Sequence, residues 1–128
     1  MADCPYRLDK RLMVVPVTLY GRSGRVTSEF VMDTGASANI IDHTLAFALG
    51  YSARDGIGYS KVTSVIGEEQ GYRLVLEGFE ALGKKSEKME VRCHDLKEEN
   101  NVEGLIGMAF LEQFSWCVHP ARKVISVE

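Results

Sequence analysis

An aspartate stands directly after an apolar run that has the pattern of a buried strand, and this stretch constrains the fold more than any other. Residues 30–32 (Phe-Val-Met) lead into Asp33, and residues 34–37 are small or carry a hydroxyl group. Asp33 is therefore expected at the mouth of an apolar core, where a carboxylate is costly unless it is paired or hydrogen-bonded. Hydroxyl groups and backbone N–H groups of the following residues are the available donors.

A turn that merely ends a strand is the ordinary alternative for this stretch, because Asp and Gly are common turn residues. The longer string Asp-Thr-Gly-Ala-Ser is more specific than its first three letters. Four fixed letters occur by chance in a chain this short about once in a thousand sequences. The string therefore favours a functional loop over a turn alone.

The string resembles the active-site loop of aspartic proteases, and the length of 128 residues resembles their single-lobe, retropepsin-like branch. Pepsin-like enzymes carry two such loops in a chain more than twice as long, whereas this chain has one Asp-Thr-Gly. The resemblance implies a homodimer in which each chain supplies one Asp33, and a peptide or protein substrate. It also implies that Thr34 bonds across the dimer, that Gly35 leaves room for the two loops, and that Ala36 and Ser37 line or support the site.

Two neighbouring carboxylates give this family its chemistry. Carboxylates about 3 Å apart cannot both ionise comfortably, so the pair shares one proton. The ionised member can take a proton from a bound water, and the protonated member can donate to the peptide carbonyl. This chemistry needs no cofactor and no covalent intermediate, so none is expected.

A second motif lies about seventy residues downstream, where Leu105 and Ile106 precede Gly107. It resembles the hydrophobic-hydrophobic-glycine motif that supports the active-site loop in the family, although the same three letters also suit the end of a core strand. In viral members an Arg, Asn or Asp often follows the glycine. Here Met108 and Ala109 follow it, as in bacterial and cellular relatives, so a salt-bridge network at this point is not expected.

A hairpin with a glycine near its tip is predicted from two strands, over residues 59–66 and 70–79. Its position matches the flap that covers the substrate in the family. Ile66, Gly67 and Glu68 are assigned to this flap, and an ordinary surface hairpin is an equally good interpretation.

Many short strands with little helix predict an all-β, barrel-like domain with one or two short helices. Further strands are expected over residues 12–20, 25–33, 38–41, 87–96, 115–119 and 123–127. Asp42 can cap a helix that buries Leu45, Ala48 and Leu49 on one face. We expect a single domain over residues 1–128, in which residues 1–11 form a loose lead-in or an edge strand.

The composition excludes several classes of function. The net charge of −3 gives no basic excess, so nucleic acid is not an expected partner. No signal peptide or membrane-spanning stretch is visible. The three cysteines are odd in number and widely spaced, which indicates no disulfide framework and favours the cytoplasm. The pairs Cys93-His94 and Cys117-x-His119 fit no standard structural zinc site, so no metal is expected.

The assembly is predicted from the chain end as well as from the loop. Residues 124–127 form a short strand that is apolar on alternate residues, and an unpaired edge of this kind invites pairing with another chain. A homodimer is therefore expected to use the Asp33 loop and the C-terminal strand. The alternative function is a dimeric peptide-binding or scaffold module that keeps the fold without useful turnover.

Overall fold

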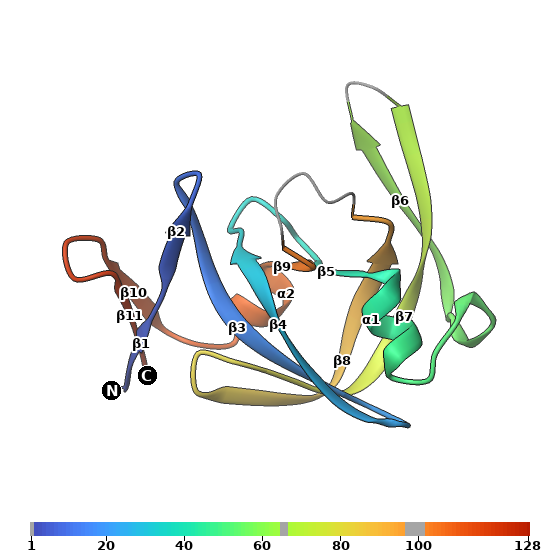
Figure 1. Cartoon of the computed structure of the whole chain (residues 1–128), viewed down its shortest axis with the longest axis horizontal. Helices are drawn as coiled ribbons and strands as arrows, with labels where there is room; N and C mark the ends of the chain where they lie inside the picture. The colour runs from blue at the N-terminus through green and yellow to red at the C-terminus, as the bar shows by residue number, and fades with distance from the viewer. Residues whose placement is uncertain (1, 65–66, 97–101) are drawn as a thin grey trace.

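The computed structural model describes residues 2–64, 67–96 and 102–128. Most of these residues lie in strands, and the two α-helices are short, which confirms the predicted all-β class (Figure 1). The larger sheet has the strand order β2-β3-β4-β9-β5-β8-β7-β6, and β3 also pairs with β7. Its strands are β2 (Arg7–Asp9), β3 (Leu12–Gly21), β4 (Gly24–Met32), β5 (Asn39–Asp42), β6 (Gly58–Ser64), β7 (Gly67–Ala81), β8 (Lys84–His94) and β9 (Gly104–Ile106). None of the helices in the described part of the chain is long and apolar enough to cross a membrane.

The hairpin of β3 and β4 carries Asp33 to its position. The two strands pair antiparallel from Val14 opposite Val31 to Gly21 opposite Gly24. On one side of β3, Pro16 pairs with β4. On the other side, β3 pairs with β2 through residues 12–14 and with β7 through residues 17–20, so Pro16 lies between these two partner strands. A proline cannot donate to a ladder, so this gap between two partner strands is a position that tolerates it.

Aromatic side chains from three parts of the chain fill the core behind this hairpin. Phe30, Phe79 and Phe110 are fully buried. The ring centroids of Phe30 and Phe79 lie 6.0 Å apart in an edge-on arrangement, and those of Phe79 and Phe110 lie 5.0 Å apart. The last apolar residues before Asp33 are therefore anchored in the centre of the molecule, which makes β4 a rigid support for the loop that follows it.

Helix α1 (His43–Ala48) begins where the sequence predicts, because Asp42 is its N-cap and accepts a hydrogen bond from the Thr44 N–H at 3.0 Å. Its buried face differs from the prediction by one residue. Leu45 and Leu49 are buried as expected, but Ala46 is buried in place of Ala48. Both alternatives fit a helical stripe, and the docking of this short helix on β5 and β8 decides between them.

Asp42 also joins two elements that are distant in sequence. Its second carboxylate oxygen, Oδ1, accepts a hydrogen bond from the Leu96 N–H at 2.8 Å, so one side chain ties the start of α1 to the end of β8. Burial alone raises the pKa of Asp42, but the hydrogen bonds from the Thr44 hydroxyl and from the N–H groups of Leu96 and Thr44 outweigh burial. The pKa therefore lies below its usual value of 3.8.

Replacing Asp42 by alanine is expected to lower the free energy of unfolding by about 2–3 kcal/mol at neutral pH, from a lost cap and a lost tie to Leu96. Because the pKa is depressed in the folded state, the charged carboxylate stabilises the fold above about pH 4, and this contribution disappears as the pH falls further. Denaturant titrations at pH 7 and pH 3 check this. The difference between wild type and Asp42→Ala should shrink at pH 3, and the exposed Asp95→Asn should change stability by less than about 0.5 kcal/mol. An equal loss of unfolding free energy in Asp42→Ala at pH 7 and at pH 3 would contradict this role of the charged carboxylate.

The chain ends form a second, three-stranded sheet in the order β1-β11-β10 (Figure 1). Its strands are β1 (Ala2–Pro5), β10 (Trp116–His119) and β11 (Val124–Val127). The first residues are therefore an edge strand and not a loose lead-in. The prediction of an unpaired edge at residues 124–127 is wrong, because β11 lies between β1 and β10 and pairs with both. Ile125 and Val127 are also buried in the core, so the C-terminal strand is committed within its own chain.

The predicted hairpin of β6 and β7 is present in the larger sheet. Its register runs from Gly58 opposite Arg73 to Ser64 opposite Gly67. Gly67 and Glu68 are therefore the first residues of β7, while Ile66 lies outside the described residues. The polar loop predicted at residues 97–101 lies outside them as well.

Candidate active site

Asp33 stands one residue beyond β4, at the point where this strand leaves the sheet. Strand β4 pairs in parallel with β9, with Met32 opposite Ile106. The Asp33 N–H continues this ladder by donating to the Ile106 carbonyl at 2.9 Å. The position of the aspartate is therefore set by the main chain of two paired strands and not by its own side chain.

The loop closes on itself through Asp33. The Gly35 N–H donates to Asp33 Oδ1 at 2.9 Å, and the Ala36 N–H donates to the Asp33 carbonyl at 3.2 Å. Aspartate commonly bonds the main chain two residues ahead in such turns. A Cβ on Gly35 would meet the same carboxylate oxygen at 3.2 Å, so glycine lets the N–H approach closely. Among the described residues, Gly35 is the one donor to this carboxylate, and Asp33 remains partly exposed.

Gly107 and the short helix α2 (Met108–Leu111) hold the other half of the loop. The Met108 N–H donates to the Ala36 carbonyl at 2.8 Å, and the Ala109 N–H donates to the Ser37 carbonyl at 3.0 Å. These N–H groups open a helix and have no partners inside it, so the loop supplies their acceptors. A Cβ on Gly107 would lie 2.1 Å from the Ala38 carbonyl oxygen, which explains the glycine. The structure thus brings the two predicted motifs into direct contact.

Asn39 is a residue of the site that sequence reasoning missed. Its side chain is fully buried, and its Oδ1 accepts a hydrogen bond from the Gly107 N–H at 3.0 Å. Its Nδ2 is buried without a hydrogen-bond partner in the described part of the chain. The sequence predicts a strand over residues 38–41 and assigns no role to Asn39. A polar amide within it was the available signal, because a buried amide needs a partner.

The remaining predicted site residues lie on the surface of the loop or away from it. Thr34, Gly35 and Ser37 are exposed, and Ala36 is partly exposed. Leu105 pairs with Val31 on one side of β9 and with Ile40 on the other. In the strand order of the larger sheet the β6–β7 hairpin lies beyond β8, while the other end of β7 pairs with β3 (Figure 1). No hydrogen bond or ion pair in the described part of the chain joins this hairpin to Asp33.

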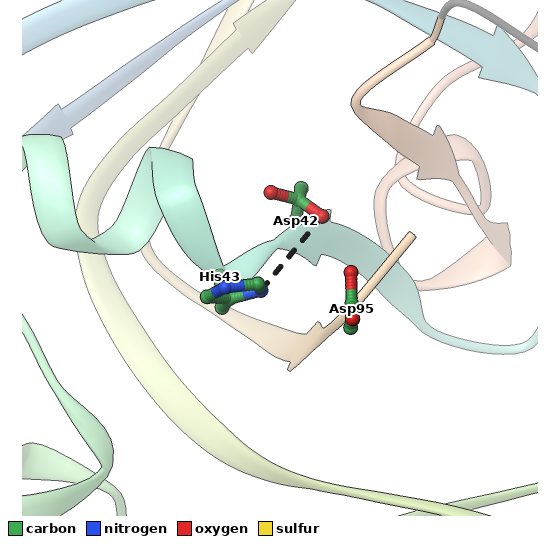
Figure 2. A group of neighbouring side chains, drawn as sticks. All are labelled: Asp42, His43 and Asp95. Atoms are coloured by element: carbon green, nitrogen blue, oxygen red, sulfur yellow. Dashed lines mark ion pairs between the residues drawn. The ribbon is translucent and has the colours of Figure 1, made fainter. Parts of the chain in front are cut away.

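A second group of titratable side chains lies at the other end of β5. Figure 2 shows Asp42, His43 and Asp95, whose ligand atoms lie within 4.8 Å of one another. Asp42 already uses both oxygens as the cap of α1 and the tie to Leu96, and His43 Nδ1 lies 3.9 Å from Asp42 Oδ1. His43 and Asp95 are exposed. These interactions explain the buried Asp42 as part of the fold.

The cysteine and histidine pairs considered for zinc are placed in different sheets. Cys93 is buried in β8, where burial raises the pKa of its thiol to about 12, and His94 Nε2 lies 2.7 Å from the Ser60 hydroxyl. Cys117 is exposed in β10, and His119 Nε2 lies 2.8 Å from the Ser126 hydroxyl. The described cysteines are free. Neither pair is arranged with the other as a set of metal ligands.

Comparison with known proteins gives the family and the fold of the chain. Residues 21–113 match the family model described as "gag-polyprotein putative aspartyl protease". A retropepsin-like aspartic protease from Rickettsia conorii has a similar structure, with a TM-score of 0.75 and 17% identity over 98% of this chain and 89% of that chain. The EIAV protease, solved with the inhibitor HBY-793, has a TM-score of 0.60 and 15% identity over 80% of this chain and 86% of that chain. No curated protein matches the sequence.

Proposed function

Because the chain belongs to the gag-polyprotein aspartyl protease family and has the retropepsin-like fold, we propose that it is an aspartic endopeptidase whose two catalytic carboxylates come from two copies of Asp33. The observation that carries the proposal is the Asp33 loop itself. The Asp33 N–H bonds β9, the Gly35 N–H donates to the Asp33 carboxylate, and the first N–H groups of α2 hold the rest of the loop. The Asp33 side chain nevertheless stays partly exposed.

The chemistry follows from what a lone Asp33 lacks. The chain has one Asp-Thr-Gly string, and one carboxylate cannot act as acid and base on the same bond at once. A second Asp33 close by would share its proton, so that one carboxylate is ionised and the other protonated. The ionised one removes a proton from water as the water attacks the peptide carbon, and the protonated one donates to the carbonyl oxygen. The pair then titrates as a unit.

A two-fold axis beside the loop supplies the second carboxylate, since identical chains most often pair through the same surface on each copy. The exposed Thr34 and Gly35 at the tip of the loop are the surface that this axis needs. The C-terminal strand β11 is not part of the proposed dimer surface, because its two edges already pair with β1 and β10. The dimer is therefore proposed to meet through the Asp33 loop. The β6–β7 hairpin, with Gly67 and Glu68 at the start of β7, is proposed to close over the substrate as a flap.

A peptide whose cleaved bond is replaced by a secondary alcohol mimics the tetrahedral intermediate. We expect such a peptide to bind at least about 100-fold more tightly than the matching uncleaved peptide, because it presents a hydroxyl between the two carboxylates as the transition state does. Calorimetry at mildly acidic pH measures both affinities. Asp33→Asn should remove the difference and Asp95→Asn should keep it. Equal affinity of the wild type for both peptides would contradict a protease site.

A further inference from the structure

One row of side chains crosses the larger sheet on the face opposite the core. Residues that pair across neighbouring strands share a face. The pairings link Val14 to Val31, Val31 to Leu105, Leu105 to Ile40, Ile40 to Arg92, and Arg92 to Arg73. The row therefore joins β3, β4, β9, β5, β8 and β7 in one line.

Burial shows which way this row faces. The residues next to it along the strands, among them Phe30, Met32 and Ile106, belong to the central core cluster. Val14 and Val31 are only 2% and 5% exposed, yet they are not part of that cluster. Since side chains alternate between the two faces of a strand, the row lies on the other face.

Asp33 belongs to the same side of the sheet as this row. It follows Val31 by two residues, and the Asp33 N–H still bonds the β9 ladder, so the alternation of β4 carries its side chain to the Val31 face. A peptide bound at Asp33 therefore lies over this row. The row is apolar beside the aspartate, at Val31, Leu105 and Ile40, and basic farther away, at Arg92 and Arg73.

The two arginines do not have equivalent surroundings. They stand directly opposite each other on β8 and β7, and like charges in this position destabilise a sheet. Arg73 is balanced by Glu90, with its Nη2 3.0 Å from Glu90 Oε1. Arg92 has no hydrogen-bond or ion-pair partner among the described residues, and its Nε is buried without an acceptor. One positive charge on this face therefore has no counter-charge in that part of the chain.

The distance suits a bound peptide. Arg92 lies three strands from Val31, which corresponds to about 14 Å between backbones. In an extended peptide, a residue two positions from the cleaved bond stands about 7 Å from it. The long side chains of arginine and glutamate can span the remainder.

We infer that Arg92 determines specificity, by pairing with an acidic side chain of the substrate within about three residues of the cleaved bond. The inference rests on the proposed protease function and adds the class of substrate to it. A guanidinium and a carboxylate form two parallel hydrogen bonds, which a glutamine side chain cannot reproduce with the same strength. Apolar residues on either side of the cleaved bond would contact Leu105 and Ile40, which are partly exposed.

The test compares peptides that differ by one atom group. A proteome-derived peptide library first shows which position is enriched in Glu or Asp, both among the peptides that are cleaved and among those that the immobilised protein retains. Two synthetic peptides with Glu or Gln at that position then give kcat/KM, and the same pair with a reduced, uncleavable bond gives Kd. We expect the wild type to prefer the Glu peptide by about 10- to 100-fold in both measurements.

Arg92→Gln should bring this preference to about one, and Arg92→Lys should leave an intermediate preference because it keeps the charge without the fork. The matched control is Arg25→Gln, which removes the same charge at an exposed position near the far end of β4 and should keep the preference. Equal treatment of the two peptides by the wild type, or an unchanged preference in Arg92→Gln, would overturn the inference. Because Kd does not depend on cleavage, a protein that prefers the Glu peptide but cuts neither would contradict the proposed function and leave this assignment standing.

Discussion

Replacing Asp33 by asparagine is expected to lower kcat/KM for peptide cleavage by at least about 1,000-fold. The substitution keeps the size of the side chain and its Oδ1, so the hydrogen bond from the Gly35 N–H can remain and the loop can keep its shape. It removes the group that accepts and returns the proton. Because each chain supplies one carboxylate to the proposed pair, a single substitution removes both. The measurement is the cleavage rate of an unstructured protein from acidic to neutral pH.

The control for this variant is Asp95→Asn, which makes the same chemical change at an exposed residue beyond β8. It should cleave like the wild type at every pH. Equal cleavage by the wild type and Asp33→Asn would contradict a role for Asp33 in catalysis. Equal peptide binding by both proteins, with no cleavage by either, would instead favour a peptide-binding module that has kept the fold.

Mixing wild-type chains with Asp33→Asn chains is expected to suppress the wild-type activity. If two chains share one site, a mixed dimer holds one carboxylate and cannot form the proton-sharing pair. With a ninefold excess of variant and random exchange, about one tenth of the wild-type chains remain paired with each other. The activity per wild-type chain should therefore fall about tenfold, as a steady-state cleavage assay can show.

The same mixture prepared with Asp95→Asn should lose no activity, because its dimers keep both Asp33 carboxylates. Exchange between chains is verified by mass spectrometry of mixed dimers that carry one labelled chain. If exchange is complete and the activity per wild-type chain is unchanged, each chain works alone and the shared site is wrong.

The contact between the two motifs was expected because Leu105-Ile106-Gly107 resembles the motif that supports the active-site loop in aspartic proteases. Asp33 ends an apolar strand and is followed by a glycine that a tight loop requires, and Gly107 ends a second apolar strand. The two motifs pack closely because glycine at position 107 leaves room for the Ala38 carbonyl, which a Cβ there would meet. The cap at Asp42 was predictable for the same reason, since it depends on residues within one turn of the helix.

The features that were not predicted depend on which strand lies beside which. Residues 124–127 have the pattern of an edge strand, but β1 and β10 occupy both edges, and a periodic pattern contains no information about the partner. The tie from Asp42 to Leu96 spans 54 residues. The position of Arg92 on the Asp33 side of the sheet follows from the register of three strand pairs, which sequence alone does not supply.

The distance between the two Asp33 carboxylates in a crystal structure of the assembled protein tests the central claim most directly. The account predicts a two-fold axis at the loop, with the nearest carboxylate oxygens about 3 Å apart, as in an aspartic protease pair. The axis can be crystallographic, so one chain per asymmetric unit is compatible with it. A dimer in which the two Asp33 side chains lie far apart would contradict the account, as would full activity at a concentration where sedimentation shows a monomer.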